Sequence, residues 1–448
     1  MFRFSAILFV ILSFVACESD YSFRGDENSI SFSADTLSFD TVFSGNASVT
    51  AKLMLYNRSA NDMTIDDISL VGGSSSLYNV SINGTAGTHL NGVRLRSGDS
   101  LHIFVNIFPP INNIEPYYIA EDDIVATAGT HSWTAHLWAC ALTAQRISGT
   151  ISTNTQWQQG VPYLISDTLN IAPNTQLSIS EGTEIYMAPA ALISIEGSLC
   201  ISGTRNAPVA LRTSRLSSFY SDIPGQWQGI ELHGSNATAN MTYTQITNAT
   251  TALQADSATS LRLTDVEIHD AQAYAIDANQ ANVEVSNCVI YNCGSSLLQI
   301  DGGTAKITHC TLVNYYKWNA RNVATITVSN NNLLSFEMLN SVVVGNLSNE
   351  IDLADDISAE QCLISHCYIR TNNRATDTDE RFNVVIIGKE PLFVDKDNND
   401  YHLQDNSPLI DAADAQYSTN LPTDHDGNSR IADDGPDIGA FEIVNTSK

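Results

Sequence analysis

The 448-residue sequence predicts an all-β protein in which an Ig-like β-sandwich is followed by a solenoid of short parallel strands. Three observations carry this prediction. A 22-residue repeat occupies part of the second half, apolar and polar residues alternate in the first, and Gly, Asn and Pro separate the expected strands.

The repeat is the strongest of these signals. Segments 241–248, 263–270, 285–292 and 307–314 superpose with an apolar first position, Ile or Leu at the sixth and Asn or Asp at the eighth. A fixed period in the twenties is typical of a solenoid, whose units are too small to bury an apolar face alone. We therefore expect a stack inside the coil and a corner at each Asn or Asp, in the left-handed backbone region. The stacked residues are Ile246, Ile268, Ile290 and Leu312.

Residues 30–145 show the pattern of a sandwich. Alternation is clear at 30–33 and 101–105, and turn signals stand at 72–73, 83–84 and 97–99. About seven strands over roughly 115 residues fit an Ig-like domain. We place this domain at 30–145 and the solenoid at 146–390.

The first 17 residues have the features of an export signal. Arg3 precedes an apolar stretch at 6–15 that is too short to span a bilayer, and 12–17 resembles a bacterial lipobox ending in Cys17. This resemblance implies a lipoprotein signal peptide at 1–17, lipidation of Cys17, and a membrane anchor at the outer membrane or cell surface. The alternative is an ordinary secretory signal without an anchor. Residues 18–29 are polar and are expected to form a tether.

Seven further cysteines follow Cys17. Cys288 and Cys310 share a repeat position, and the run at 362–364 aligns with 288–290. Cys293 and Cys367 each lie five residues after one of these cysteines. We expect a column of small, free, inward-facing thiols that accounts for all five, Cys288, Cys293, Cys310, Cys362 and Cys367. A disulfide between adjacent turns and metal ligation are the alternatives, although no zinc-type spacing is present.

A family resemblance rests on the run at 224–230, on the 22-residue turns, and on a signature spread over 391–442. The chain resembles right-handed parallel β-helix (pectate-lyase-like) repeat proteins, especially bacterial lipoproteins with an N-terminal Ig-like module. The resemblance implies a right-handed parallel β-helix whose closing segment, 391–448, caps the coil. A cap is physically reasonable because an open last ladder is a sticky edge.

Two insertions leave the regular coil, at 214–226 and 315–332, and insertions often carry binding. They contain aromatic residues that can stack on sugar rings and an arginine that can bind carboxylates or hydroxyls. The candidate ligand residues are Phe219, Tyr220, Tyr315, Tyr316, Trp318 and Arg321. The alternative is that these side chains cover the coil, and Trp227 in particular is expected in the core.

Carboxylates that acid–base chemistry would need are also present near the repeat. Alternation places Asp265, Glu267 and His269 on one side of a strand, with Asp270, Asp277, Asp301 and His309 nearby. None of the catalytic signatures of polygalacturonase-like or pectate-lyase-like enzymes is evident. We therefore interpret these residues as part of an acidic surface rather than as a catalytic set.

The run 395–400 resembles the start of a calcium loop, with Asp395, Asp397 and Asn399 as ligands. It lacks the central glycine, and Asn406 stands where the twelfth-position Glu would be. The resemblance makes calcium a candidate cofactor, whereas the two departures favour the alternative, a solvated loop.

The net charge of −28 limits the range of partners. It repels phosphate backbones, which excludes nucleic acid, and disfavours acidic polysaccharides unless divalent cations bridge them. The leading hypothesis is a lipid-anchored cell-envelope protein that binds a polysaccharide or surface glycan without catalysis. The alternatives are a polysaccharide lyase or glycoside hydrolase and a purely structural component. A groove on the coil in which a cationic base lies beside acidic side chains would favour the enzyme hypothesis over the binding hypothesis.

Overall fold

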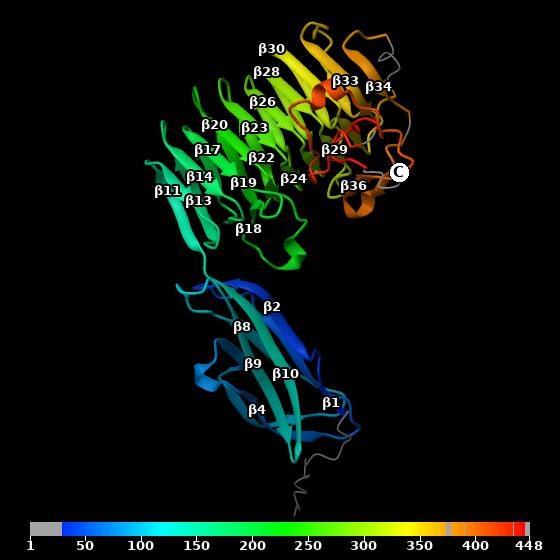
Figure 1. Ribbon diagram of the computed structural model, residues 1–448. Helices are drawn as coiled ribbons and strands as arrows, with labels where there is room; N and C mark the ends of the chain where they lie inside the picture. The colour runs from blue at the N-terminus through cyan, green and yellow to red at the C-terminus, as the bar shows by residue number, and fades with distance from the viewer. Residues whose placement is uncertain (1–28, 373–377, 389, 433, 444–448) are drawn as a thin grey trace, which may run out of the picture. The chain divides into compact units, whose positions relative to one another are not determined.

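The computed structural model describes residues 29–372, 378–388, 390–432 and 434–443 (Figure 1). The expected signal peptide, Cys17 and the tether up to residue 28 lie outside the described residues. The chain divides into two compact units, Met1–Leu142 and Thr143–Lys448, which are described separately.

The first unit is an Ig-like β-sandwich of two five-stranded sheets. One sheet has the order β1 (Ile30–Phe32), β3 (Ala51–Asn57), β8 (Ser100–Ile107), β5 (Tyr78–Ile82), β6 (Thr85–Ala86). The other has the order β2 (Thr36–Phe43), β10 (His131–Leu142), β9 (Tyr117–Ala128), β4 (Met63–Leu70), β7 (His89–Leu95). A short 3₁₀ helix, η2 (Gly73–Ser75), follows β4. In β8 the alternation works as expected, since Leu101, Ile103 and Val105 are buried between exposed neighbours.

The second unit is a parallel β-helix built from a single 24-stranded ladder, β11 to β34. Its pairings run parallel from turn to turn and define three faces. The first face contains β12 (Thr155–Trp157), β14 (Gln176–Ser180), β17 (Ser198–Ser202), β20 (Thr238–Thr242), β23 (Ser260–Thr264) and β26 (Asn282–Ser286). The second contains β15 (Glu184–Met187), β18 (Val209–Thr213), β21 (Thr244–Thr247), β24 (Glu267–His269), β27 (Val289–Tyr291), β29 (Thr311–Asn314) and β31 (Val342–Gly345). The third contains β16 (Leu192–Ile195), β19 (Trp227–Leu232), β22 (Ala249–Ala255), β25 (Ile276–Asn279) and β32 (Ile351–Leu353).

The other strands of the ladder turn a corner and contribute to two faces. They are β11 (Gln145–Ile151), β13 (Tyr163–Ile171), β28 (Leu298–Thr308), β30 (Ile326–Leu339), β33 (Cys362–Ile369) and β34 (Phe382–Ile386). The remaining pieces are short: β35 (Phe393–Asp395), β36 (Asp400–Leu403) and the 3₁₀ helices η3 (Ser218–Tyr220), η5 (Lys396–Asn398) and η6 (Ala415–Ser418). Among the described residues, no helix has the length and apolar character needed to cross a membrane.

The predicted internal stack is confirmed. Ile246 pairs with Ile268, Ile268 with Ile290, and Ile290 with Leu312 on successive turns, and all four are fully buried. Trp227 lies in the same core, as expected. Each such side chain fills the space left by the one below it, so the core runs continuously along the coil.

The Asn and Asp corners are also confirmed, with one exception. Asn248, Asp270 and Asn292 have φ of 64°, 55° and 54°, in the left-handed region. Asn314 is not among the left-handed residues, because the chain leaves the coil there for the second insertion. Its side chain instead bonds the Cys293 amide and the Ser295 carbonyl.

Within the residues that the structure describes, all seven cysteines are free, and five of them are buried: Cys288, Cys293, Cys310, Cys362 and Cys367. The predicted place of Cys362 is wrong. It pairs with Phe336 on the first face, whereas Cys367 aligns through Ser341 with Cys310 and Cys288. Uneven insertions change the spacing after residue 314, so the local similarity of 362–364 to 288–290 gave the wrong register.

The C-terminal segment (residues 390–443) lies along the flank of the β-helix (Figure 1). Its Phe393, Tyr401, Leu409 and Phe441 pack with outward apolar side chains of the second face, among them Val313. The expectation of a cap over the last turn is thus replaced by a cover over β27, β29, β31 and β33. The reason is that these strands are apolar on their outer as well as their inner side.

Candidate functional site: a groove on the second face

The outer side of the second face is polar where the C-terminal segment does not cover it. Arg212 on β18, Gln245 on β21, and Glu267 and His269 on β24 point outward from consecutive turns. Two hollows, of about 320 Å³ and 170 Å³, adjoin over this sheet and share Gln245. We call these two hollows together the groove. It crosses β18, β21 and β24 from the corner before these strands to the corner after them.

The first insertion forms one wall of the larger hollow. Arg215, Ser218 and Asp222 line it, and the Arg215 guanidinium lies over the Tyr220 ring, 5.1 Å from its centroid. Phe219 packs edge-on against Tyr220 and is 74% exposed. Trp318, from the second insertion, is also exposed and donates its indole N–H to the Asp222 carbonyl over 3.1 Å. Three of the predicted ligand residues, Phe219, Tyr220 and Trp318, thus gather beside the groove.

Two other predicted ligand residues lie inside the protein. Tyr316 is buried, and Arg321 is buried with its Nη2 2.6 Å from Glu350 Oε1. The structure therefore corrects the expectation that these side chains are available to a ligand. Tyr315 is partly buried and lines a separate hollow with Arg370 and Lys396, whose ammonium lies 5.7 Å from the ring centroid.

The floor of the groove contains a connected set of acid–base side chains. Glu267 accepts hydrogen bonds from Tyr291 Oη (2.8 Å) and from Gln245 Nε2 (3.1 Å). His269 Nδ1 lies 2.7 Å from Asp270 Oδ2, and its ring stacks on Tyr291 with a 4.6 Å centroid separation. Burial alone would lower the pKa of His269, but the Asp270 carboxylate raises it above the ordinary value.

Asp265 occupies the corner at the end of the smaller hollow, with φ of 56°. It is 8% exposed, and its Oδ1 has no hydrogen-bonding partner within the part of the chain that the structure describes. Burial raises the pKa of Asp265 to about 6, against the opposing effect of His425. A buried carboxyl oxygen without a partner costs free energy unless a ligand or water meets it.

The C-terminal segment forms the other wall. His425 and Asp426 line the smaller hollow, and His425 Nδ1 lies 2.9 Å from the Asn287 carbonyl oxygen. His402 bridges Asp426 (2.8 Å) and Asp400 (2.6 Å). The hydrogen bond to Asp426 raises the pKa of His402 to about 9. Deeper under the segment, Arg430 binds Glu442 and the Asn287 side chain.

The residues of the predicted calcium loop take part in hydrogen bonds that hold the loop in place. Asp395 Oδ1 accepts from the amides of Asp397 and Asn398 and so caps η5, while Asn399 Oδ1 accepts from Tyr401 Oη and Asn292 Nδ2. In the described part of the chain, no three His, Cys, Asp or Glu side chains are grouped to hold a metal ion. The loop thus attaches the C-terminal segment to a corner of the coil.

Sequence reasoning named Asp265, Glu267 and His269 but treated them as unrelated surface groups. The structure brings them into one groove, together with Arg212 and Gln245, which the sequence did not single out. Arg212 is held by Glu184 (2.7 Å) and Tyr186 Oη (2.9 Å). Asp277 and Asp301 lie on the third face, and His309 is buried against Ser418. Gln245 stands at the repeat position of Glu267 one turn earlier, so the repeat could have placed it beside Glu267, whereas the insertion at 214–226 interrupts the spacing before Arg212 is reached.

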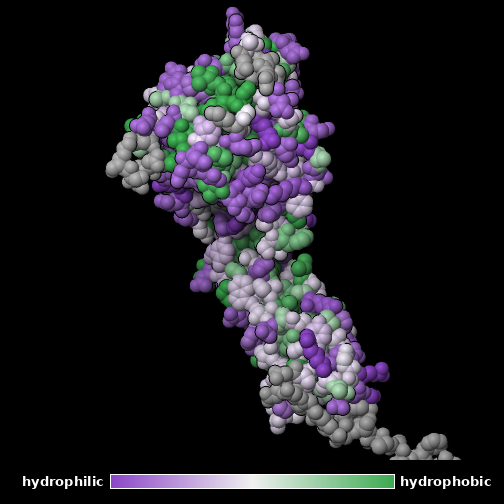
Figure 2. Space-filling view, turned by 90° about the vertical axis from the view of Figure 1, so that its right-hand side faces the viewer, coloured by the Kyte–Doolittle hydropathy of each residue, from purple (hydrophilic) through white to green (hydrophobic). Residues whose placement is uncertain are grey.

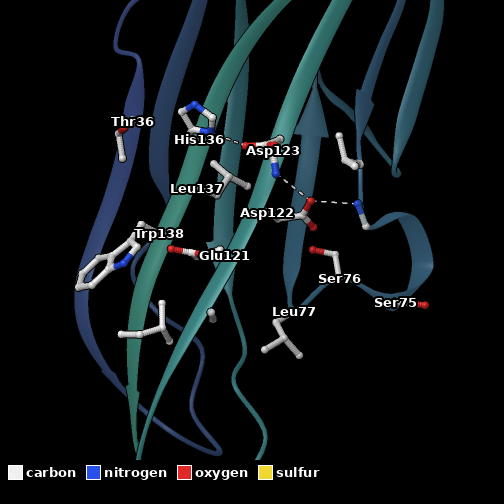
Figure 3. Close-up of a pocket in the computed structure, with 14 residues that line it drawn as sticks. Thr36, Ser75, Ser76, Leu77, Glu121, Asp122, Asp123, His136, Leu137 and Trp138 are labelled. Carbon is white, nitrogen blue, oxygen red and sulfur yellow. Dashed lines mark hydrogen bonds and ion pairs between the residues drawn. The ribbon is translucent and has the colours of Figure 1, made fainter.

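A larger hollow of about 770 Å³ lies on the sandwich (Figure 3). Two of its acidic groups already have local partners. Asp122 accepts from the amides of Gly72 and Asp123, and Asp123 pairs with His136 over 2.6 Å. We therefore place the candidate site in the groove, where polar side chains from consecutive turns line both hollows.

Comparisons with known proteins give no family. No protein-family model matches the chain, and neither does any curated protein. Among solved structures, the PapD-like domain 7 of human CEP192 is 11% identical and covers 32% of this chain and 99% of its own, with a TM-score of 0.18. A family 123 glycoside hydrolase from Clostridium perfringens is 14% identical, with coverages of 29% and 30% and a TM-score of 0.21.

The VesB protease of Vibrio cholerae is 15% identical, with coverages of 26% and 32% and a TM-score of 0.19. This chain therefore spans about a third of the length of the hydrolase and the protease. TM-scores this low support no conclusion about fold or function, so both rest on the structure itself.

Proposed function

We propose that the protein is an exported, lipid-anchored component of the cell envelope that binds a glycan in the groove. The observation that carries this proposal is the polar floor of Gln245, Glu267 and His269 near the exposed rings of Phe219, from the first insertion, and Trp318, from the second. Outer membrane or cell-surface attachment through Cys17 follows from the lipobox-like sequence.

The chemistry of the groove suits sugar rather than an apolar ligand. Amide, carboxylate and imidazole groups offer both donors and acceptors to hydroxyls, and the rings of Phe219, Tyr220 and Trp318 offer apolar faces for stacking. Hydrophilic residues cover most of the β-helix surface seen in Figure 2, with apolar residues in smaller patches among them. A site of this kind recognises its ligand by hydrogen bonds and ring contacts.

Charge selects among glycans. The net charge is −28, and the floor contains Asp265 and Glu267, while the guanidinium of Arg212 is already paired with Glu184. A polyanionic glycan would meet like charge along the groove. We therefore propose a neutral polysaccharide or surface glycan as the ligand.

A glycan array with the purified full-length protein in mild detergent tests this function, followed by calorimetry on the best binder. The variants Gln245→Ala and Tyr220→Ala should each weaken binding about 10-fold, equivalent to about 1.4 kcal/mol. Arg262→Ala, on the outer side of the first face, should bind normally. A blank array, or unchanged affinity in both groove variants, would support a purely structural role instead.

The anchor is tested separately. Cells that express the protein and are fed an alkyne fatty acid should yield a labelled protein in the membrane fraction, and Cys17→Ala should abolish the label. Labelling of the Cys17→Ala variant would contradict this part of the proposal.

A further inference from the structure

We propose that the hollow on the sandwich binds a lysine or arginine side chain from a peptide segment of a partner protein. The cation would lie over the indole ring of Trp138 and pair with the carboxylate of Glu121. This site is separate from the groove, since it belongs to the first unit and takes a cationic ligand rather than a sugar.

The hollow is built on the outer side of one sheet. Trp138 on β10 stands directly opposite Glu121 on β9 in the antiparallel register, and Figure 3 shows them on neighbouring strands. Side chains paired in this way start from Cβ atoms about 4.5–5.5 Å apart and point to the same side of the sheet. Ser75 and Ser76, from the loop after β4, add hydroxyl groups to the lining. The volume of about 770 Å³ is within the range of about 300–1,000 Å³ that is typical of ligand sites.

The ring of Trp138 lines this hollow without a partner of its own. The side chain is partly buried, yet in the described part of the chain no cationic or aromatic side chain packs on its ring and no acceptor meets its indole N–H. By contrast, Arg58, Arg212 and Arg215 each lie over a tyrosine ring. An indole offers the most favourable aromatic face for a cation, within about 6 Å of the ring centroid. The Trp138 ring can therefore receive a cation from a ligand.

The Glu121 carboxylate is exposed, and no hydrogen-bond donor or cation pairs with it among the described residues. Its neighbours differ, because Asp122 accepts from the amides of Gly72 and Asp123, and Asp123 pairs with His136 over 2.6 Å. No lysine or arginine is present in the described lining of the hollow. The countercharge that Glu121 favours would thus come from the same ligand that the indole ring favours.

The flanks of the hollow favour a peptide side chain over a lipid headgroup. Val71 is 63% exposed and Ile119 is 53% exposed, so apolar surface is available to the aliphatic stem of a lysine or arginine. The phosphate of a zwitterionic headgroup would instead meet the carboxylates of Glu121, Asp122 and Asp123. The net charge of −28 also attracts a basic segment over a longer range.

The test uses surface plasmon resonance on the immobilised full-length protein, with a Ser-Gly peptide that contains one central lysine as the probe. Binding should persist when arginine replaces this lysine, because a guanidinium also stacks on aromatic rings. Acetylation of the lysine should weaken binding about 10-fold or more, because it removes the charge. Trp138→Leu should weaken binding of the unmodified peptide about 5- to 10-fold, and Glu121→Gln about 3-fold.

Glu115→Gln is the matched control, because it removes an exposed carboxylate of the same unit that does not line the hollow. This variant should bind the peptide as the parent does. Glycan binding should be unchanged in Trp138→Leu, so a failure of this proposal is distinguishable from a failure of the groove. Thermal unfolding shows whether Trp138→Leu disturbs the sandwich, and Glu121→Gln, at an exposed position, tests the site independently.

Equal losses in Glu121→Gln and Glu115→Gln would reduce the effect to general charge attraction and overturn the site. Equal affinity for the acetylated peptide, or absence of peptide binding at millimolar concentration, would do the same. Phosphatidylcholine vesicles are the last arm of the test. Vesicle binding that requires Trp138, without peptide binding, would assign the hollow to a headgroup and overturn the peptide partner.

Discussion

Arg321 and Glu350 form an ion pair that is sealed from solvent. Arg321 Nη2 lies 2.6 Å from Glu350 Oε1, and both side chains have no exposed surface. Glu350 Oε2 also accepts from the amide and hydroxyl of Thr325. The pair fixes the second insertion to the coil, which holds Trp318 in place beside the groove.

Replacing only Arg321 should be strongly destabilising. Arg321→Ala leaves the buried Glu350 carboxylate without its countercharge, which costs about 3–5 kcal/mol of unfolding free energy. Urea denaturation measures the change. The double variant Arg321→Met with Glu350→Leu should recover most of the loss, and an Arg321→Ala protein as stable as the parent would contradict the structural role assigned here.

Truncating a side chain of the internal stack should lower the free energy of unfolding by a similar amount. Ile268 is fully buried between Ile246 and Ile290. Ile268→Ala should cost about 2–5 kcal/mol, because it removes buried methylenes and leaves a cavity that a close-packed solenoid fills poorly. Arg262→Ala, on an exposed side chain, should change stability by less than about 0.5 kcal/mol.

Asp265 should make stability depend on pH in a particular direction. Its pKa is raised by burial from 3.8 to about 6, so folding favours the protonated form. Its stabilising contribution is complete below pH 3.8 and is lost as pH rises through about 6. Relative to the parent, Asp265→Asn should therefore gain roughly 1–3 kcal/mol between pH 4 and pH 7. Denaturant titrations at both pH values check this, and a difference that is independent of pH would contradict it.

The hydrogen bond between His402 and Asp426 should also make the free energy of unfolding depend on pH. Its pKa is raised from 6.5 to about 9 by the hydrogen bond to Asp426, so its contribution is complete below pH 6.5 and is lost as pH rises through about 9. The side chain is 46% exposed, and solvent screening limits the effect to under about 1 kcal/mol. His402→Gln should lower stability at pH 6 but not at pH 10, and an equal loss at both would exclude the charged bridge.

The five buried thiols should be unreactive in the native protein. Burial raises the pKa of Cys293, Cys362 and Cys367 to about 12, and Cys288 is shifted in the same direction. Labelling by iodoacetamide should therefore follow the unfolding rate, because it needs an exposed thiolate. Mass spectrometry locates the labels, and rapid native modification of Cys310 would contradict the free, inward-facing column.

The sequence alone was sufficient for the coil but not for the groove. The positions of Ile246 and Ile268 follow from a local period that repeats turn by turn, and the corner at Asp270 follows from local backbone preference. The path of the C-terminal segment depends on contacts such as Arg430 with Asn287, 143 residues apart, which no period encodes.

The misplaced site residues have the same cause. The sequence suggested that Arg321 could bind a ligand, because its partner, Glu350, is 29 residues away on a different turn. Glu267 and His269 were correctly placed on one side of a strand, but Gln245 and Tyr291 come from the turns before and after, and His425 comes from the covering segment. Only the folded arrangement shows that these groups enclose a hollow.

A crystal structure of the full chain with the tightest-binding oligosaccharide tests the central claim most directly. We predict sugar density over Gln245 and Glu267, between the first insertion and the C-terminal segment. Sugar bound only elsewhere, for example beside Trp138 on the sandwich, would contradict the account.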